Sequence, residues 1–239
     1  MEAQVMAILN VTPDSFYAPS RIGNRDLLTS RAARAIAEGA SILDIGACST
    51  RPGSTPASQE EEWQRLEPAL RLLRETFPDM PLSVDTFRAE IARRALESFG
   101  RMTINDVSGG DEAMFAVVRK YRVPYVWTLR GDFSRLREWN RMMDMDIILD
   151  PGLGFTGGVG QDYACLRRVH ELKEYKCPVL VGVSRKSMLW KKLDITPEEC
   201  LSATQVLHFY ALQQGASILR VHDVKEAKQT IDIYNTIYP

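Results

Sequence analysis

Polar residues that could bind a ligand stand at the ends of five short apolar segments. They are Asn10 in MAILNVTPDSF, Asp85 in PLSVDT, Asn105 in TINDV, Asp150 in IILDPG, and the pair Arg220 and His222 in ILRVHD. A carboxylate, amide or imidazole at the carboxyl end of a parallel strand costs stability unless something binds there. A (β/α)8 barrel collects all such ends on one face. The pattern therefore predicts a barrel with a polar mouth that binds a ligand.

Two acids and one amide of this set would face one another across the mouth. Asp85, Asp150 and Asn105 could exchange hydrogen bonds with the edge of a flat, nitrogen-rich heterocycle in a pocket that excludes water. Alternatively, each acid could cap the next helix, where Asp is favoured, but capping does not explain why all of them fall at strand ends. Asp106 would point to the opposite side of its strand, and we expect a structural role for it.

The segment VGVSRKSMLW carries two basic residues where the seventh strand leads into a helix. Backbone N–H groups at such a junction often form an anion site in barrels. Lys186 could donate to a ring carbonyl or nitrogen, with Ser187 beside it. In the alternative interpretation, Arg185 and Lys186 are ordinary solvated charges.

A diphosphate site is predicted at the end of the eighth strand. Arg220 and His222 are two residues apart, so their side chains share a face of the strand. Asn10 ends the first strand, which adjoins the eighth in a closed barrel, and the three residues could hold a diphosphate and its Mg2+. His222 could instead be a satisfied core histidine. His170 and His208 lie within helical patterns, and we assign no function to them.

Two long Pro-containing loops, NVTPDSFYAPSR and GACSTRPGSTP, follow the first two strands. Thr50, Arg51 and Pro52, opposite Phe16, would form a mobile lid that carries a cation and an aromatic surface. Such a lid could close over a second substrate. Otherwise these are simply polar surface loops.

Eight apolar, β-branched segments would position these residues: VMAILNV, SILDIG, PLSVD, MTINDV, PYVWTL, DIILD, PVLVGV and SILRVHD. Each precedes an amphipathic stretch, which indicates right-handed βαβ units and a parallel sheet. We expect helices near 26–38, 58–77, 88–99, 111–121, 161–175, 196–215 and 224–237, and a short or irregular one near 133–143. The predicted fold is α/β, a single (β/α)8 TIM barrel domain over 1–239 with its active site at the C-terminal ends of the strands. An open doubly wound sheet would need a Gly-rich fingerprint after the first strand, which is missing.

The composition points to a small-molecule partner. The chain has 239 residues and a formal net charge of −1, with acids and bases interspersed, so no field recruits nucleic acid or an anionic membrane. Four scattered cysteines without ligand spacing are typical of buried thiols in a reducing compartment and argue against a zinc site. No apolar stretch reaches the roughly 20 residues that span a bilayer. We expect a cytoplasmic protein.

Seven strings occur here in a family-specific order: NVTPDSF, DIGACSTRPG, SVDT, INDV, DPGLGF, VGVSRKS and RVHDV. Together they closely resemble the dihydropteroate synthase family, the pterin-binding barrels of the folate pathway that sulfonamides inhibit. The resemblance runs from Met6 to Val224. It implies condensation of 7,8-dihydropterin pyrophosphate with 4-aminobenzoate to give 7,8-dihydropteroate and diphosphate, with Mg2+ as cofactor and a homodimer as the assembly.

The resemblance also implies roles for individual residues. The pterin would be held by Asp85, Asn105, Asp150 and Lys186, the diphosphate by Arg220 and His222, and Mg2+ by Asn10 with pyrophosphate oxygens. The aminobenzoate carboxylate would lie near Ser187, and its ring near Phe16, Thr50, Arg51 and Pro52. Phe155 is counted with the substrate-binding residues, whereas Arg51, Asp85, Lys186, Arg220 and His222 are counted as catalytic.

Three segments differ from the family pattern. Residues 154–158 read GFTGG where the family has GFGKT, residues 127–129 read WTL in place of MHM, and Ala47 and Cys48 replace Gly-Glu. Two other functions therefore remain open: a paralogue that binds pterin without turnover, and a corrinoid-linked pterin methyltransferase domain, which would not be expected to need both STRPG and SRKS.

Overall fold

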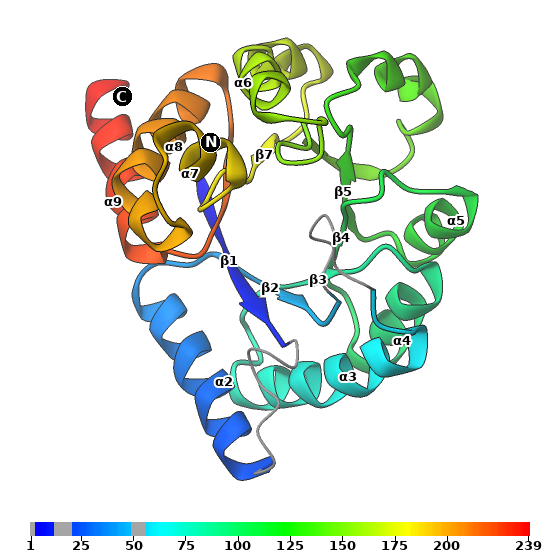
Figure 1. The fold of residues 1–239 in the computed structure, drawn as a ribbon. Helices are drawn as coiled ribbons and strands as arrows, with labels where there is room; N and C mark the ends of the chain where they lie inside the picture. Colours follow the sequence, from blue (N-terminus) through cyan, green and yellow to red (C-terminus); the bar gives the residue numbers. More distant parts are fainter. Residues whose placement is uncertain (1–2, 12–20, 49–55) are drawn as a thin grey trace.

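A computed structural model describes residues 3–11, 21–48 and 56–239. Eight strands form one parallel sheet: β1 (Gln4–Asn10), β2 (Ile42–Gly46), β3 (Leu82–Asp85), β4 (Thr103–Asp106), β5 (Pro124–Thr128), β6 (Asp146–Asp150), β7 (Leu180–Val181) and β8 (Ile218–Val221). All eight predicted strands are confirmed. Figure 1 shows them at the centre of the molecule, with helices around them.

The strand order is β6-β5-β4-β3-β2-β1-β8-β7, so the first and eighth strands pair and the sheet curls into a barrel. The seam between β6 and β7 is the thinnest part of this wall. β7 has only two residues, and the seam is closed by a bridge between Leu149 and Val179, where the Leu149 N–H donates to the Pro178 carbonyl at 2.9 Å. The predicted (β/α)8 barrel is therefore confirmed.

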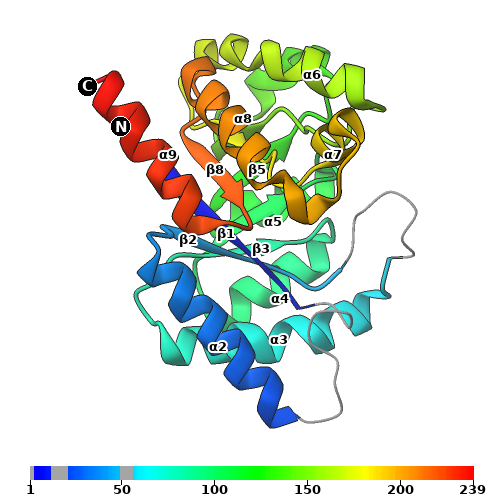
Figure 2. The ribbon, with the colours of Figure 1, turned by 60° about the vertical axis from the view of Figure 1, so that its left-hand side comes forward.

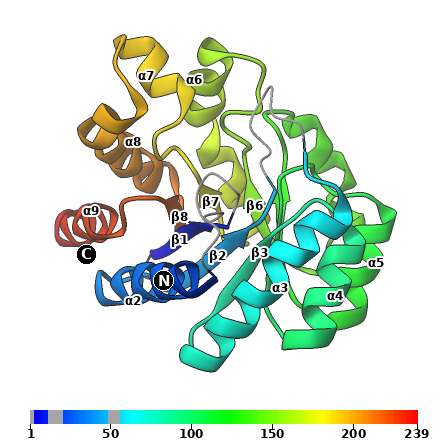
Figure 3. The same ribbon diagram turned by 60° about the horizontal axis from the view of Figure 1, so that its bottom comes forward.

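The helices are α2 (Arg21–Ala37), α3 (Gln59–Thr76), α4 (Ala89–Phe99), α5 (Glu112–Tyr121), α6 (Val159–Arg167), α7 (Ser187–Leu193), α8 (Leu201–Gln214) and α9 (Val224–Ile237), with 3-10 segments η1 (Phe133–Arg141), η2 (Val169–Tyr175) and η3 (Pro197–Cys200). Figure 3 shows α2 to α5 side by side on the outside of the barrel. The irregular fifth helix is confirmed as η1. The single helix expected over 161–175 is wrong, because α6 ends at Arg167 and η2 follows.

Local sequence explains where the strongest helix begins. Ser58 caps α3: its hydroxyl accepts from the Glu61 N–H at 3.3 Å, while the Glu61 carboxylate accepts from the Ser58 N–H at 2.8 Å. Leu66, Leu70 and Leu73 are then buried at helical spacing, so one face of α3 packs on the barrel wall. In the described ranges, every helix is too short or too polar to cross a bilayer.

Two apolar layers hold the barrel together. The larger one fills the space between strands and helices. The smaller one is a plug inside the barrel, formed by Met6, Ile42, Val126, Ile148, Leu180 and Ile218. Because side chains alternate between the faces of a strand, the plug fixes which residues further along each strand also point inward.

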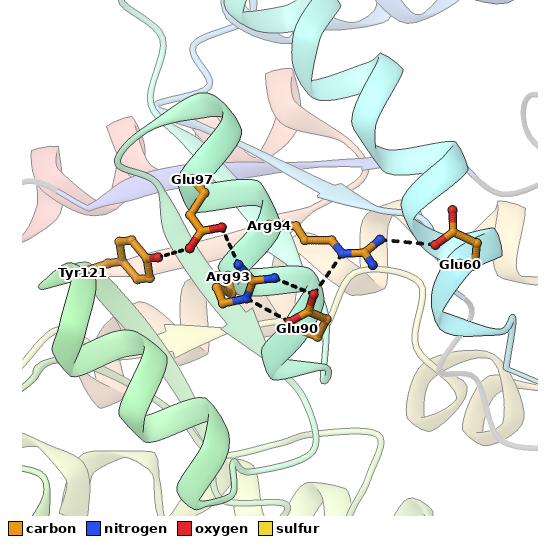
Figure 4. Close-up of polar contacts among 6 residues, drawn as sticks. All are labelled: Glu60, Glu90, Arg93, Arg94, Glu97 and Tyr121. Carbon is orange, nitrogen blue, oxygen red and sulfur yellow. Dashed lines mark hydrogen bonds and ion pairs between the residues drawn. The ribbon is translucent and has the colours of Figure 1, made fainter.

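Charged side chains link neighbouring helices on the outer surface. Figure 4 shows Arg94 of α4 between Glu90 and Glu60 of α3, while Glu97 accepts from Arg93 and from Tyr121 of α5. Each pair is solvent-accessible and contributes little alone. The network lies on the helical ring, and we assign it to helix packing rather than to the site.

Candidate active site

Polar side chains make up most of the inner face above the plug. Asp44, Thr128, Asp150 and Arg220 stand two positions after the plug residues Ile42, Val126, Ile148 and Ile218, while Gly182 follows Leu180 and Ile8 follows Met6 at the same spacing. A side-chain period of two places both sets on the inner face of the barrel. The carboxyl ends of the strands therefore surround a polar layer, as the sequence predicts.

Arg220 of β8 lies at the centre of this layer. Its Nε donates to Oδ2 of Asp44 at 2.7 Å, and its Nη2 donates to Oδ2 of Asp85 at 2.5 Å. The Asn105 amide Nδ2 also donates to Asp44 Oδ2, at 3.0 Å. Side chains from β2, β3, β4 and β8 thus meet across the mouth of the barrel.

Burial and neighbouring charges shift the pKa values of Asp85 and Arg220. Loss of water raises the pKa of Asp85 to about 7, because burial disfavours the charged carboxylate; Arg220 opposes the rise and Asp44 adds to it. Burial works to lower the pKa of Arg220, but the Asp44 and Asp85 carboxylates outweigh it and hold that pKa above its ordinary value. Arg220 therefore stays charged while Asp85 is poised to titrate near neutral pH.

Asp150 and Lys186 form the other half of the layer. The Gly152 N–H donates to Asp150 Oδ1 at 2.8 Å, and the Thr128 hydroxyl donates to Oδ2 at 3.4 Å. Burial raises the pKa of Asp150 and lowers that of Lys186, while the opposite charge of each partner works against the shift. Lys186 Nζ donates to the Leu153 carbonyl.

Gly182 shows that the two halves share one space. A Cβ built on Gly182 would lie 3.8 Å from both Arg220 Cβ and Lys186 Nζ, so the cation of one half reaches the backbone beside the other. We call Asp44, Asp85, Asn105, Asp150, Lys186 and Arg220 the polar cluster. The predicted grouping of Asp85, Asn105, Asp150 and Lys186 thus agrees with the geometry.

The turn before α7 presents Lys186. Arg185 adopts a left-handed conformation with φ 53°, which is unusual for a residue with a Cβ. Its guanidinium pairs with Asp223 at 2.5 Å and its N–H donates to Thr204 Oγ1 at 3.3 Å, so tertiary contacts hold the turn. Arg185 and Lys186 are therefore not ordinary solvated charges.

The Phe155 ring lies beside two cationic side chains at the edge of the polar cluster. Lys186 Nζ is 5.4 Å from the centre of the Phe155 ring, and the Arg130 guanidinium carbon is 5.7 Å from it. Ser187 is the first residue of α7 and is partly exposed beside Lys186. Both predicted substrate-binding residues are thus next to the polar cluster.

Asn10 ends β1 at the rim of the mouth. A Cβ built on Gly46 would lie 3.6 Å from Asn10 Oδ1 and 3.3 Å from Asp85 Cβ, so glycine leaves room beside the amide oxygen. Among the described residues, no group of three or more His, Cys, Asp or Glu side chains could hold a metal. A single amide oxygen still fits Mg2+, which keeps several waters and binds substrate phosphates.

His222 has a different environment from Arg220. It follows β8, is exposed, and lines a cavity of about 310 Å3 together with Arg31, Arg34 and Arg185. The guanidinium of Arg220, by contrast, points into the polar cluster. The expected shared role of this pair in diphosphate binding stays a prediction.

Four predicted residues, Phe16, Thr50, Arg51 and Pro52, lie outside the described residues. The segments that flank the second loop are tied to the end of β3. Arg88 donates to the Ala57 carbonyl at 2.5 Å, lies 4.0 Å from Cys48 Sγ and pairs with the buried Glu62. Glu62 also accepts from the hydroxyl of Thr86, the residue after Asp85, at 2.6 Å.

Two inward residues, Asp44 and Thr128, were not predicted. A charged residue inside the apolar segment ILDIG was the available signal for Asp44. Asp106 faces outward as expected, accepting from Tyr125 Oη at 3.0 Å. Trp127 also faces outward and donates to the Gly109 carbonyl at 3.0 Å. Of the WTL segment that departs from the family, Thr128 is the residue that contacts the polar cluster, through its hydrogen bond to Asp150.

Comparison with known proteins places this arrangement in a family. The model of the pterin binding enzyme family matches residues 6–132 and 134–222. The folic acid synthesis protein fol1 of Pneumocystis carinii is 36% identical over 98% of this chain, which spans 36% of that longer protein. The dihydropteroate synthase of Synechocystis is 34% identical over 98% of this chain and 90% of its own length.

Solved structures agree with this assignment. FolP (dihydropteroate synthase) from Clostridium difficile, crystallised in the presence of pteroic acid, superposes with a TM-score of 0.91 at 33% identity and covers 99% of this chain and 97% of its own. The Xanthomonas albilineans dihydropteroate synthase with 4-aminobenzoic acid gives 0.87 at 33% identity, with 99% and 93% coverage. The chain therefore belongs to the pterin-binding enzyme family and, within it, to the dihydropteroate synthases, transferases of folate biosynthesis.

Proposed function

We propose that this family member condenses 6-hydroxymethyl-7,8-dihydropterin diphosphate with 4-aminobenzoate, giving 7,8-dihydropteroate and diphosphate. The observation that carries the proposal is the convergence of Asp85, Asn105, Asp150 and Lys186 at one barrel mouth around Arg220. Carboxylates, an amide and a buried ammonium match a ring that has N–H donors and a carbonyl acceptor on its edge. The relatives with pteroic acid and 4-aminobenzoic acid support the same substrates.

The chemistry requires charge stabilisation rather than a covalent nucleophile. The C–O bond at the pterin methylene breaks, its electron pair leaves with diphosphate, and the arylamine nitrogen attacks the methylene and then loses a proton. Asp85 and Asp150, buried near the ring, would favour cationic character in the transition state. Holding the ring fixed would align the methylene with the incoming amine.

The leaving group needs cations. Arg220 and His222 would receive the diphosphate, and Asn10 would hold Mg2+ together with diphosphate oxygens. When bound, the metal would neutralise charge on the departing anion. The second substrate would place its carboxylate near Ser187 and its ring against the loops that carry Phe16, Thr50, Arg51 and Pro52.

A turnover assay tests this proposal. The purified protein is incubated with the pterin diphosphate, 4-aminobenzoate and Mg2+, and dihydropteroate and diphosphate are measured together. Equimolar release of both products is expected. Saturable pterin binding without diphosphate release would support the non-catalytic paralogue, and methyl transfer from methyltetrahydrofolate would support the corrinoid-linked methyltransferase.

We also propose that the protein is a cytoplasmic homodimer that associates through α8 and α9. Figure 2 shows these two helices side by side, and Phe209 and Tyr234 join them through rings 5.8 Å apart. Apolar side chains on them face solvent: Val206 is 68% exposed and Ile233 58%. A homodimer would cover this surface.

Light scattering after size exclusion measures the oligomeric state. The wild-type protein should have twice the mass of the chain, and Val206→Glu should shift it toward one chain. Leu193→Glu, on the exposed part of α7, is the control and should leave the mass unchanged. A wild-type monomer would rule out the dimer without affecting the proposed reaction.

A further inference from the structure

Asp44 is a fully buried carboxylate in the middle of β2, and neither a helix cap nor an outer ion pair accounts for it. Its Oδ2 accepts two hydrogen bonds, from Arg220 Nε at 2.7 Å and from Asn105 Nδ2 at 3.0 Å. In the strand order, β8 and β4 each stand two places from β2. One oxygen therefore joins two site residues that lie on opposite sides of it.

The first consequence concerns the Asn105 amide. Only the NH2 group of an amide can donate to a carboxylate, so the bond to Asp44 fixes which end of the amide is which. The Asn105 oxygen must then point away from Asp44. In this orientation Asn105 offers an acceptor to a ligand, like Asp85 and Asp150.

The second consequence concerns Arg220. Its guanidinium is divided between two carboxylates: Nε bonds Asp44 and Nη2 bonds Asp85. A guanidinium prefers a two-bond contact with a single carboxylate. Without Asp44, Arg220 could pair fully with Asp85 and occupy the oxygens that a ligand needs.

We propose that Asp44 is the positioning residue of the pterin site: it turns Asn105 so that its oxygen faces the ligand and keeps Arg220 from closing on Asp85. The inference rests on the proposed function, since it assumes that the ring binds at the polar cluster. Asp44 itself would not touch the ring. Its role is to make the site a set of acceptors, which selects a heterocycle that presents N–H donors.

The test compares binding of 6-hydroxymethylpterin to wild type, Asp44→Asn and Ile45→Val by calorimetry from about pH 5 to 9, the range around the raised Asp85 pKa. Asp44→Asn should weaken binding about 10- to 100-fold, as expected for a lost charged hydrogen bond. The acid limb, which is the fall in affinity at low pH as Asp85 becomes protonated, should also move to lower pH. The reason is that Arg220 then pairs with Asp85 alone and favours its charged form. Ile45→Val, the next residue on the outer face of β2, should change neither the affinity nor the limb.

A reciprocal variant separates positioning from loss of structure. Asp44→Asn combined with Asn105→Asp keeps the charge count and the hydrogen bond between the two positions, but a carboxylate at 105 can offer only acceptors. This double variant should regain part of the affinity that Asp44→Asn loses. Thermal unfolding of each variant confirms that the protein is folded.

The outcomes are distinct. If the wild type does not bind 6-hydroxymethylpterin, the proposed function fails. If the wild type binds it and Asp44→Asn binds equally well with the same acid limb, the inference about Asp44 is wrong. A double variant no better than Asp44→Asn would also overturn it.

Discussion

The Nη2 atom of Arg220 lies 2.5 Å from Oδ2 of Asp85, although the two residues are on strands three places apart in the barrel wall. Burial raises the pKa of this carboxyl group to about 7 even with the guanidinium beside it. Burial therefore disfavours the negative charge on Asp85, and a ligand that donates a hydrogen bond to this carboxylate would stabilise it.

Asp85→Ala should reduce pterin affinity strongly. The substitution removes a buried acceptor, and a hydrogen bond to a charged group contributes about 1.5–3 kcal/mol. Titration calorimetry with 6-hydroxymethylpterin measures the loss. Asp79→Ala, in the exposed turn before the same strand, is the matched control and should bind like the wild type. Wild-type affinity in Asp85→Ala would argue strongly against the pterin site.

Asp85→Asn should raise the thermal stability of the protein more at pH 8 than at pH 5. An ordinary Asp titrates near 4, so between about pH 4 and 7 the folded state holds a proton that the unfolded state has lost. The contribution of Asp85 to stability therefore falls as pH rises through this window. Asparagine does not titrate, so the melting temperature of the variant should exceed that of the wild type by a few degrees above pH 7.

The same comparison with Asp79→Asn gives the baseline for an exposed carboxyl group. The melting temperature of Asp79→Asn should differ from that of the wild type by the same amount at the two pH values. If the difference in melting temperature for Asp85→Asn is also independent of pH, Asp85 is already ionised at pH 5.

Gly154→Ala should weaken pterin binding through Lys186. A Cβ at Gly154 would lie 3.0 Å from Lys186 Cδ, so the lysine chain would have to shift. Gly157→Ala is the control: both glycines have positive φ, 87° and 103°, but nothing lies within 4 Å of a Cβ at Gly157. Both variants should lose stability of about 1–3 kcal/mol from backbone strain. Only Gly154→Ala should lose affinity for the pterin. Equal pterin affinities of the two variants would show that Lys186 does not contact the ligand.

Gly46→Ala should raise the Mg2+ concentration needed for half-maximal turnover. The new methyl group would lie between Asp85 and Asn10, in the space beside the amide oxygen. Gly160→Ala in α6, which has nothing within 4 Å, should leave the Mg2+ dependence unchanged. An unaltered dependence in Gly46→Ala would place the metal elsewhere.

The strands and the ends of most of them could be predicted because each signal is local. An acid after an apolar run, as in SVDT or IILDPG, marks both the end of a strand and a polar function. Asp44 was missed because it stands two residues before the end of β2, where only the alternation of faces shows that it points inward. Its partners, Arg220 and Asn105, come from strands that are distant in the sequence.

The helical part was harder for physical reasons. Leu166, Val169 and Leu172 are buried at three-residue intervals, a spacing that fits a 3-10 helix as well as an α-helix. The hydrophobic pattern of the sequence therefore does not reveal the break at Arg168. The helix α7 has seven residues and is too short to show a period. The environment of His222 likewise depends on α2, which no pattern near the histidine reveals.

The short β7 strand has a mechanical consequence. Backbone pairing across the β6–β7 seam is sparse. The Lys186 side chain nevertheless crosses the seam to donate to the Leu153 carbonyl, and Asp150 is the last residue of β6 on that side. A ring bound by Asp150 and Lys186 together would link the two sides of the β6–β7 seam, which has the fewest backbone hydrogen bonds in the barrel wall. Occupancy of the site should therefore slow amide exchange most at Leu149, whose N–H crosses the seam to the Pro178 carbonyl, so that this amide reports the bound state.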